Sequence, residues 1–402
     1  MKIAIISDWH LGLNWKTELE MDSFIQLEEA FKQIETENVD LVLCAGDLFD
    51  KQLPNHEVYF QAIKVLNKIN IKNNIELKNK FGQLLKIPMI GIIGNHEYRG
   101  KDYISTVELL EIIGFLKVIH AENIKIEKEN EKINIFGISG LPDSLIKEIL
   151  NKWNPKPIEN EKNILLLHQS IKEYLPFETE DMLSLSNLPK GFNLIINGHL
   201  HWNTLIDLEQ GKFLMPGSTV ATQLKKIESN NKKGFYIYDS KKEEYKYIEI
   251  KNTRQIIYLD LKYNNKTISE IKYNIIEKIN QSLEKIKKEN INKKPFIRIK
   301  IKGELEDGFF SKDLNISYIE KEFQEKAYIS ISNKLEEKSI KESVEKLKDL
   351  QKNKGNIFEI SKEIFFEQLK QTKLNNSFDT KRLFEALYNK DIEKAKEIIF
   401  KN

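Results

Sequence analysis

Cysteine is almost absent from this sequence of 402 residues, with Cys44 as the single example. One cysteine cannot form an internal disulfide, which excludes the class of small secreted proteins held together by disulfides. Cys44 lies in the apolar run Leu41–Ala45. We therefore expect a buried, unreactive thiol in a strand, in keeping with a reducing compartment.

Long hydrophobic runs are also missing. No apolar stretch approaches the ~18 residues that a membrane-spanning helix needs. The N-terminal apolar run ends at Ile6 and turns polar at Ser7-Asp8, so it is too short for the core of a signal peptide. These absences predict a cytoplasmic protein with no membrane partner.

Neither sign of charge dominates, because 63 lysines and arginines face 61 acidic residues for a formal net charge of +2. A near-neutral total neither supports nor excludes a nucleic-acid partner, since local patches carry that signal. The chain has no Pro-rich or Gly-rich linker and no internal repeat. Its length predicts about two to three domains.

Short apolar runs alternate with amphipathic stretches through the first 250 residues. Buried strands are predicted at Ile3–Ile6, Leu41–Cys44, Ile90–Ile93, Ile133–Ile138, Ile164–Leu167 and Leu194–Ile196. Helices are predicted at Phe24–Glu35, Tyr59–Ile69 and Ile104–Ile113. After about residue 200 the pattern predicts strands only. This order predicts a layered α/β domain over residues 1–252 with a strand-rich second half.

Two smaller parts follow. Residues 253–334 predict a small α/β cap with strands at Ile256–Leu261, Phe296–Ile301 and Tyr328–Ser332, and a helix carrying Ile271, Ile275 and Ile279. Residues 335–402 predict a helical tail, with stripes at Val344, Leu347 and Leu350 and again near Leu383 and Ile398. Asp379 is the expected N-cap of the penultimate helix.

Five polar segments end predicted strands of the first domain. They are Asp8-Trp9-His10, Gly46-Asp47-Leu48-Phe49-Asp50, Gly94-Asn95-His96-Glu97, His168 within Leu165-Leu166-Leu167-His168-Gln169, and Asn197-Gly198-His199-Leu200-His201. Open α/β sheets build their sites at the carboxyl ends of strands, so these groups should meet. Five of the seven histidines fall in these segments. A lone histidine is usually a satisfied core residue, but the set as a whole indicates a site. His120 is expected to be structural, and His56 either a substrate contact or a solvated helix start.

The residue types in these segments suit a pair of divalent metals. Carboxylate, amide oxygen and imidazole together favour manganese, zinc or iron over calcium. Asp8 and His10, one residue apart on an extended chain end, are expected to point the same way and hold one ion, and His199 and His201 share that spacing. Asp47 has two oxygens and is the natural candidate to bridge both ions.

The order and wording of these motifs resemble the calcineurin-like metallophosphoesterase superfamily. Within it, the chain resembles the double-strand-break repair nucleases called SbcD in bacteria and meiotic-recombination-eleven elsewhere. The residues in and around the motifs that carry this resemblance are Ser7-Asp8-Trp9-His10-Leu11-Gly12, Ala45-Gly46-Asp47-Leu48-Phe49, Leu167-His168-Gln169 and Pro216-Gly217-Ser218-Thr219. The fold so implied is a layered calcineurin-like β-sandwich flanked by helices.

The resemblance implies a role for each motif residue. One metal would be held by Asp8, His10, Asp47 and His201, and the second by Asp47, Asn95, His168 and His199. His96 would be the catalytic histidine beside the scissile phosphate. Asp50 stands where archaeal and eukaryotic relatives often carry another histidine. Many SbcD-type relatives have an aspartate there, as this chain does.

The implied activity is a manganese-dependent DNA exonuclease and endonuclease that processes DNA ends. DNA, an SMC-like ATPase of the SbcC type and a second copy of the chain are the implied partners. Arg99 and Lys101 are candidate phosphate contacts, with Gln223–Lys226 as a further basic loop; either loop can equally be a solvated charged surface. Two alternatives stay open: another phosphoesterase, such as a phosphatase or nucleotide phosphodiesterase, and a non-catalytic scaffold that binds DNA ends.

Overall fold

The computed structural model describes residues 1–72, 75–100, 103–176, 179–209, 211–288 and 293–337, then 361–362, 364–366, 369 and 379–400. The chain divides into two compact units. One comprises Met1–Tyr258 with Asn292–Arg298, and the other Leu259–Ile291 with Ile299–Asn402. The predicted division at residues 252 and 334 stays a prediction.

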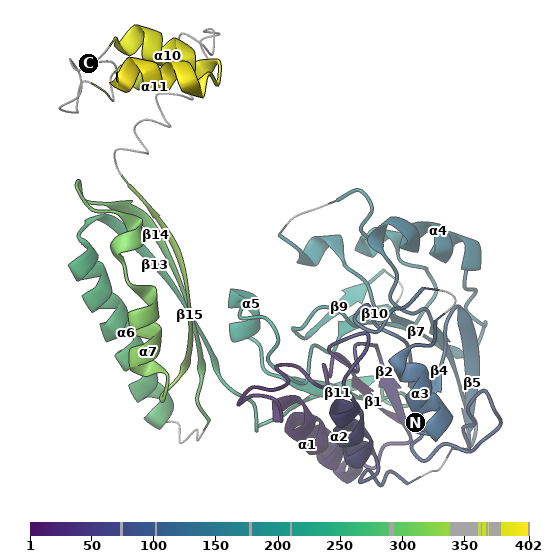
Figure 1. The fold of residues 1–402 in the computed structure, drawn as a ribbon. Coiled ribbons are helices and arrows are strands. Elements are labelled where there is room, and N and C mark those ends of the chain that lie inside the picture. Colours follow the sequence, from purple (N-terminus) through teal and green to yellow (C-terminus); the bar gives the residue numbers. More distant parts are fainter. Residues whose placement is uncertain are drawn as a thin grey trace. The chain divides into compact units, whose positions relative to one another are not determined.

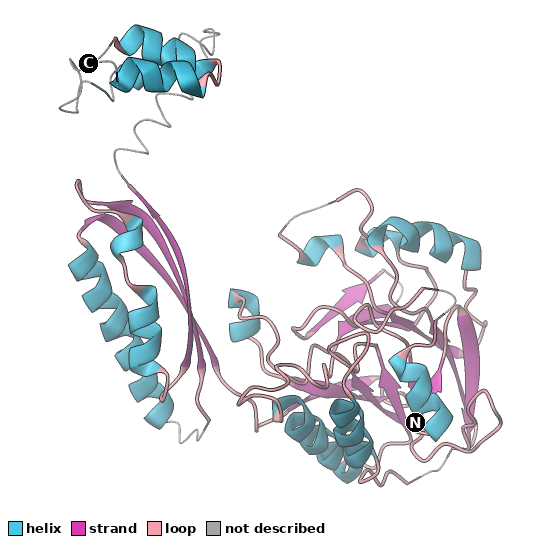
Figure 2. Cartoon of the chain, viewed as in Figure 1, coloured by secondary structure: helices cyan, strands magenta, loops and turns pink. Residues whose placement is uncertain are grey.

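Two mixed six-stranded sheets form the centre of the first unit (Figures 1 and 2). In the first sheet the strand order is β12-β11-β1-β2-β3-β4. Its strands are β1 (Lys2–Ile6), β2 (Leu41–Cys44), β3 (Met89–Gly91), β4 (Lys117–Val118), β11 (Gly234–Asp239) and β12 (Glu244–Glu249). β1 to β4 run parallel, whereas β11 and β12 are antiparallel to their neighbours.

The second sheet has the order β5-β6-β7-β8-β10-β9. Its strands are β5 (Glu122–Lys128), β6 (Glu131–Gly137), β7 (Lys162–Leu167), β8 (Leu194–Asn197), β9 (Thr204–Leu208) and β10 (Gly211–Met215). β6, β7, β8 and β10 run parallel. The carboxyl ends of the parallel strands in both sheets carry the motif segments, as the sequence predicted.

Side chains alternate between two faces along each central strand. Ile3 and Ile5 of β1 join a core that also contains Ile164 and Leu166 of β7, so this core lies between the sheets. Ala4 and Ile6 of β1 instead pack against the helices on the other side. Because successive strand side chains point to opposite faces, each central strand is buried on both sides.

Helices cover the outer faces. α1 (Asp22–Thr36), α2 (His56–Leu66) and α3 (Thr106–Ile113) supply apolar residues to the core on the first sheet. α4 (Asp143–Trp153) packs on the second sheet, where Ile146 and Leu150 meet Phe136. The layered α/β fold with a β-sandwich flanked by helices is therefore confirmed.

The second unit contains a three-stranded sheet of order β13-β14-β15 with two helices. Its elements are β13 (Ile256–Lys266), α6 (Ile268–Lys288), β14 (Phe296–Leu305), α7 (Ile316–Phe323) and β15 (Tyr328–Glu336). Ile271, Ile275 and Ile279 of α6 are fully buried, as the stripe predicted. β13 and β14 begin in the first unit.

The last described elements are α10 (Thr380–Tyr388) and α11 (Ile392–Phe400), which pack together through Leu383, Ala386 and Ala395. Asp379 caps α10, because its Oδ1 accepts hydrogen bonds from the backbone of Lys381 and Arg382. The predicted stripe at Val344, Leu347 and Leu350 lies outside the described residues.

Three sequence expectations were wrong in detail. A one-turn helix, α5 (Lys226–Ser229), interrupts the region after residue 200 where only strands were expected. β15 continues through Leu335 and Glu336, where the tail was expected to be helical already. The chain at Asp8 and His10 is not extended, since both have a positive φ, at 54° and 46°.

Candidate metal centre

Five loops bring the motif side chains together, three from the first sheet and two from the second. Asp8 follows β1, Asp47 follows β2 and Asn95 follows β3. His168 directly follows β7, and His199 lies two residues after β8. The site therefore lies at one edge of the sandwich, where strand ends of both sheets meet.

Left-handed backbone turns aim these side chains. Asp8, His10, Asp47 and His199 all have φ between 46° and 76°, a region that non-glycine residues rarely adopt. Each such residue costs on the order of 1–3 kcal/mol and persists only where the surroundings fix it. Here the fixing comes from backbone hydrogen bonds between loops, such as Asp8 N to Gly46 O (3.0 Å) and His10 N to Asp47 O (3.1 Å).

Glycine is required where loops cross. A Cβ on Gly94 would lie 2.0 Å from Asp47 Oδ1, and one on Gly198 would lie 2.2 Å from the Ala45 carbonyl oxygen. The Gly94 Cβ would also lie 2.3 Å from Asp47 N, so neither position can accept a Cβ unless backbone moves. The glycines of the Gly-Asn-His and Gly-His-Leu-His motifs therefore exist to let the loops approach one another.

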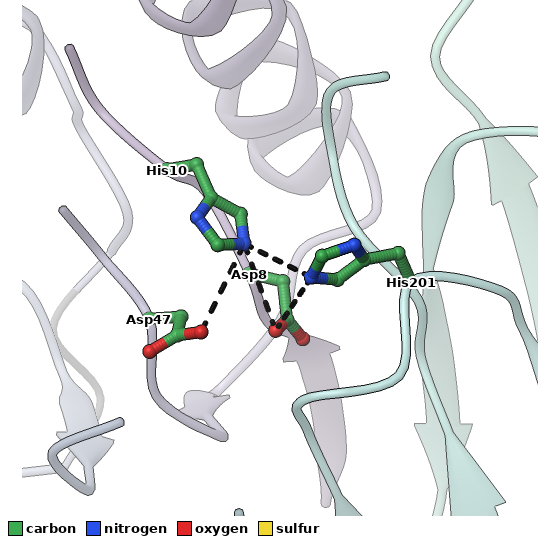
Figure 3. Close-up of side chains that lie close together, drawn as sticks. All are labelled: Asp8, His10, Asp47 and His201. Carbon is green, nitrogen blue, oxygen red and sulfur yellow. Dashed lines mark hydrogen bonds and ion pairs between the residues drawn. The ribbon is translucent and has the colours of Figure 1, made fainter. Parts of the chain in front are cut away.

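Among the described residues, three groups of side chains could hold a metal ion; two of them share Asp47, and the third is His10, Asp50 and His96. Asp8, His10, Asp47 and His201 form the first group, and Asp47, His168 and His199 form the second. His10 Nε2 lies 3.1 Å from His201 Nε2, and the two rings are nearly perpendicular, with these nitrogens directed toward each other beside Asp8 and Asp47 (Figure 3). Asp47 Oδ2 lies 3.2 Å from His168 Nε2 and 3.9 Å from His10 Nε2, between the groups.

Asn95 completes the second group. Its Oδ1 lies 3.0 Å from His168 Nε2 and 2.7 Å from His199 Nδ1. The far nitrogens of these rings have other partners, since His168 Nδ1 donates to the Ala45 carbonyl oxygen and His199 Nε2 lies 3.3 Å from Ser170 Oγ. The nitrogens facing Asn95 are thus the ones available to a cation.

Electrostatics show the need for positive charge at this site. Burial and the neighbouring Asp47 raise the pKa of Asp8 to about 6, although His168 opposes this. Burial works against a charged His168, yet Asp47 and Asp8 raise its pKa to about 9. Burial also disfavours ionisation of Asp47, but His168 and His10 hold its pKa far below the usual value. A proton on His168 compensates the paired carboxylates.

The site fits divalent metal ions. Among the described residues, no hydrogen bond reaches the buried Asp8 Oδ2, and Asp47 Oδ2 has an ion pair with His168 at 3.2 Å. Buried carboxylate oxygens normally have a partner, and a cation would supply one. Burial and the charge of His168 lower the pKa of His199 to about 4, and burial beside His10 lowers that of His201 well below its usual value. Both rings are therefore neutral, the form in which imidazole binds a metal, whereas His168 would have to release its proton when an ion binds.

Residues 1–203, half of the chain, match the family described as calcineurin-like phosphoesterase. The chain belongs to that family. It is a phosphoesterase with a site for divalent metal, as the sequence predicted.

Curated relatives narrow the family to the SbcD and Mre11 type. The chain is 30% identical over 319 residues to the DNA double-strand break repair protein Mre11 of Sulfolobus acidocaldarius, covering 75% of each chain. It is 29% identical to the protein of the same name from Saccharolobus solfataricus, covering 76% of each. The human double-strand break repair protein MRE11 is 24% identical over 75% of this chain and 50% of its own.

The remaining site candidates of this phosphoesterase include one residue beside the metal centre, His96, and one outside the described residues, Lys101. His96 Nε2 lies 4.0 Å from Asp47 Oδ2, and its ring is partly exposed. Arg99 donates to the Ile104 carbonyl oxygen (3.2 Å) and lies over the Tyr103 ring, in the loop after His96. Lys101 lies outside the described residues, and His56 is exposed at the first position of α2.

Sequence reasoning gave no role to two acidic residues that hold the loops. Glu97 is fully buried and accepts hydrogen bonds from Phe49 N (2.6 Å) and Gly94 N (2.9 Å), which joins the loops after β2 and β3. Asp50 approaches His10 Nδ1 with its carboxylate (3.5 Å), and its carbonyl oxygen accepts from His96 Nδ1 (2.7 Å). The acid after Gly-Asn-His was the available signal for Glu97.

Proposed function

We propose that this phosphoesterase is a two-metal DNA nuclease that processes ends in double-strand-break repair, with Mn²⁺ as its ion. One observation carries the proposal: Asp47 belongs to both groups of ligands, which is what a bridging carboxylate between two ions requires. The relatives named as double-strand break repair proteins point to DNA as the substrate.

The proposed ligands of one ion are Asp8, His10, Asp47 and His201, and those of the other are Asp47, Asn95, His168 and His199. The mixture of carboxylate, amide and imidazole donors favours manganese, zinc or iron. When bound, two such ions supply Lewis-acid polarisation of a phosphodiester and a water of lowered pKa.

His96 is the proposed proton donor to the leaving oxygen. Because its Nδ1–H is bound to the Asp50 carbonyl oxygen, its Nε2 is left to face the site beside Asp47. Its backbone N–H is fixed as well, by Asp47 Oδ1 at 2.9 Å. With Nδ1–H held in this way, the ring can donate a proton from Nε2 only as the doubly protonated imidazolium, which is the form that general-acid catalysis requires.

Arg99 is the proposed phosphate contact, and Lys101 is proposed on the sequence alone. The guanidinium of Arg99 already has a partner in Ile104 O, which positions it on the loop that leaves His96. Contacts of this kind fix the register of a nucleic acid without reading its sequence.

A homodimer is proposed through α2 and α3. Val58, Val65, Leu66, Val107 and Leu110 of these helices are buried in the first unit's core. The large apolar side chains left exposed on these helices are Phe60, Leu109 and Ile112, at 64%, 40% and 43%. These three side chains support an isologous contact.

An SMC-like ATPase is the proposed partner of the tail. After α10 and α11 pack on each other, Leu387, Ile392 and Phe400 stay exposed, Phe400 at 79%. Two helices of this length are marginal alone, and exposed apolar residues on them suit docking against a coiled coil.

A nuclease assay tests the function. End-labelled single-stranded and duplex DNA are incubated with the protein in Mn²⁺, Mg²⁺, Zn²⁺ or chelator, beside bis-p-nitrophenyl phosphate. We expect cleavage of DNA that Mn²⁺ supports best and chelator abolishes. Hydrolysis of the small ester with intact DNA would mean a different phosphoesterase, and no hydrolysis with any ion would mean a scaffold.

A further inference from the structure

A chain of buried polar groups stands behind His201, on the side away from Asp8. The hydroxyl of Thr222 hydrogen-bonds His201 Nδ1. Glu228 accepts from that hydroxyl (3.1 Å) and is itself 2% exposed. Lys233, 5% exposed, donates to Glu228 Oε1 at 2.6 Å. All three residues lie beyond residues 1–203, which the family match covers.

The contacts of Glu228 settle its charge. Its Oε1 faces the backbone N–H of Thr222 (2.9 Å) and the ammonium of Lys233, and its Oε2 faces the backbone N–H of Gln223 (2.8 Å). Each of these groups can only donate. A protonated carboxyl would point its own hydrogen at another donor, so Glu228 is an acceptor at both oxygens and carries a negative charge.

The charge of Glu228 sets the direction of the remaining hydrogen bonds. Because Glu228 only accepts, the Thr222 hydroxyl must donate its single hydrogen to Glu228. The hydroxyl oxygen then has only lone pairs to offer His201 Nδ1. A neutral ring bound in this way carries its proton on Nδ1 and leaves Nε2 unprotonated.

Lys233 also fixes the backbone of His201. Its Nζ donates to the His201 carbonyl oxygen (3.0 Å) and to Ser218 Oγ (2.7 Å). Ser218 Oγ in turn donates to the Val220 carbonyl oxygen at 2.7 Å. The ammonium therefore holds the His201 loop and the loop that carries Thr222 at a fixed separation, which positions the ring as well as its tautomer.

We propose that Thr222, Glu228 and Lys233 are positioning residues that hold His201 as the Nδ1–H tautomer with Nε2 presented to the metal site. The proposal rests on the proposed function for its use, because Nε2 is the atom that lies 3.1 Å from His10 Nε2. Residues behind metal ligands act in this way, and their loss costs about 10–100-fold in metal affinity.

The tautomer can be read without any metal. Metal-free protein is labelled with ¹⁵N-histidine, and a two-bond ¹H–¹⁵N correlation spectrum is recorded at neutral pH, with His201→Asn used to assign the signal. We expect His201 to show a protonated Nδ1 and an unprotonated Nε2. A protonated Nε2 in the parent overturns the proposal, and the one variant that this measurement needs is the one that assigns the signal.

Metal affinity tests the consequence. Mn²⁺ binding is titrated calorimetrically for the parent, Thr222→Val, Thr222→Ser and Thr219→Val. Thr219 is the matched control, since its buried hydroxyl has no hydrogen-bond partner among the described residues. We expect Thr222→Val to bind about 10–100-fold more weakly and to show Nε2–H at His201, while Thr222→Ser and Thr219→Val bind as the parent does.

The outcomes separate this proposal from the proposed function. Thr222→Val binding Mn²⁺ as tightly as the parent overturns the positioning role. The positioning role is also overturned if Thr222→Val binds Mn²⁺ more weakly but has a lower melting temperature without metal and an unchanged His201 tautomer. That result would mark a purely structural role. A parent that binds no Mn²⁺ refutes the proposed function, whereas the spectrum of the metal-free parent still decides the tautomer.

Discussion

Asp47 lies between the two groups of histidines, with Oδ2 within 4 Å of His10, His96 and His168. Exchanging it for Ala, or for the isosteric Asn, should remove more bound metal than a change at any other ligand, because it belongs to both groups. Metal per chain is measured by mass spectrometry after dialysis against Mn²⁺. Equal metal content in Asp47→Ala and the parent would show that Asp47 does not bridge.

His96 separates chemistry from metal binding. His96→Ala should keep both ions and lose about 10²–10⁴-fold in hydrolysis rate, the usual cost of a lost general acid. His56→Ala is the matched control, because His56 is exposed on α2 outside both groups of ligands. If His96→Ala loses metal instead, His96 is a ligand and not the acid.

The residues of the metal site could be predicted from the sequence, but the hydrogen bonds that position them could not. Asp8, His10, Asp47, Asn95, His168, His199 and His201 were all found from strand-end motifs, and the structure brings them together. Thr222, Glu228 and Lys233 carry no such signal. Their partners are fixed only when the chain after β10 folds back beside His201.

The left-handed backbone conformations of Asp8 and His10 could not be predicted from the sequence either. Spacing alone suggested that Asp8 and His10 share one direction because they sit on an extended chain. In the folded protein each occupies a turn that interloop hydrogen bonds maintain. The spacing therefore identified the correct pair of residues, although the extended backbone on which that inference depended is not present.

At the scale of elements, α3 begins with a capping box. Ser105 accepts from Val107 N, and Glu108 accepts from Ser105 N at 2.9 Å. Burial opposes the charge on Glu108, but the bonds from Ser105 and Lys80 hold its pKa below the usual value of 4.5. Folding thus favours the ionised form of Glu108.

The sign of the resulting pH dependence follows. A carboxyl with a lowered folded-state pKa adds stability above its unfolded pKa, and that stability is lost as pH falls through the folded value. Glu108→Gln should therefore lose less stability than the parent when acidified from about pH 5.5 to pH 3.5. Urea unfolding at both pH values measures this. An identical pH dependence in both proteins would contradict the assignment.

Elements with strong patterns were predicted well, and weak ones were missed. β2 was placed at its true bounds, because Leu41–Cys44 is an unbroken apolar run buried on both faces. β5 carries Ile124 and Ile126 among charged residues, so only pairing with β6 identifies it. α4 buries just Ile146 and Leu150, too short a stripe to stand out in this charged sequence.

The tail helices allow a test by truncation. Removing the residues after Leu374 deletes α10 and α11 together with their mutual core. We expect the shortened protein to stay folded and to cut DNA with Mn²⁺, while failing to co-purify with the SMC-like ATPase. A melting temperature many degrees lower would instead show that the tail stabilises its own chain.

At the scale of the whole molecule, the exposed apolar residues of α2 and α3 predict self-association. Phe60→Glu combined with Leu109→Lys should convert a dimer to a monomer and leave the fold intact, because neither side chain is buried in the core. Light scattering at micromolar concentration gives the mass. Ile25→Lys on α1 is the control, as Ile25 is exposed at 40% on a different helix. A parent that is already monomeric excludes the dimer.

The metal centre draws its ligands from both sheets of the sandwich, β1 to β3 on one side and β7 and β8 on the other. Bound ions would therefore link the two sheets at the edge where their strand ends meet. No helix in the described part of the chain is long and apolar enough to cross a bilayer. The hydrogens of backbone amides at the ends of β2 and β7 should then exchange with solvent at similar rates. The exchange should be fast in the metal-free protein and slow once the ions are bound.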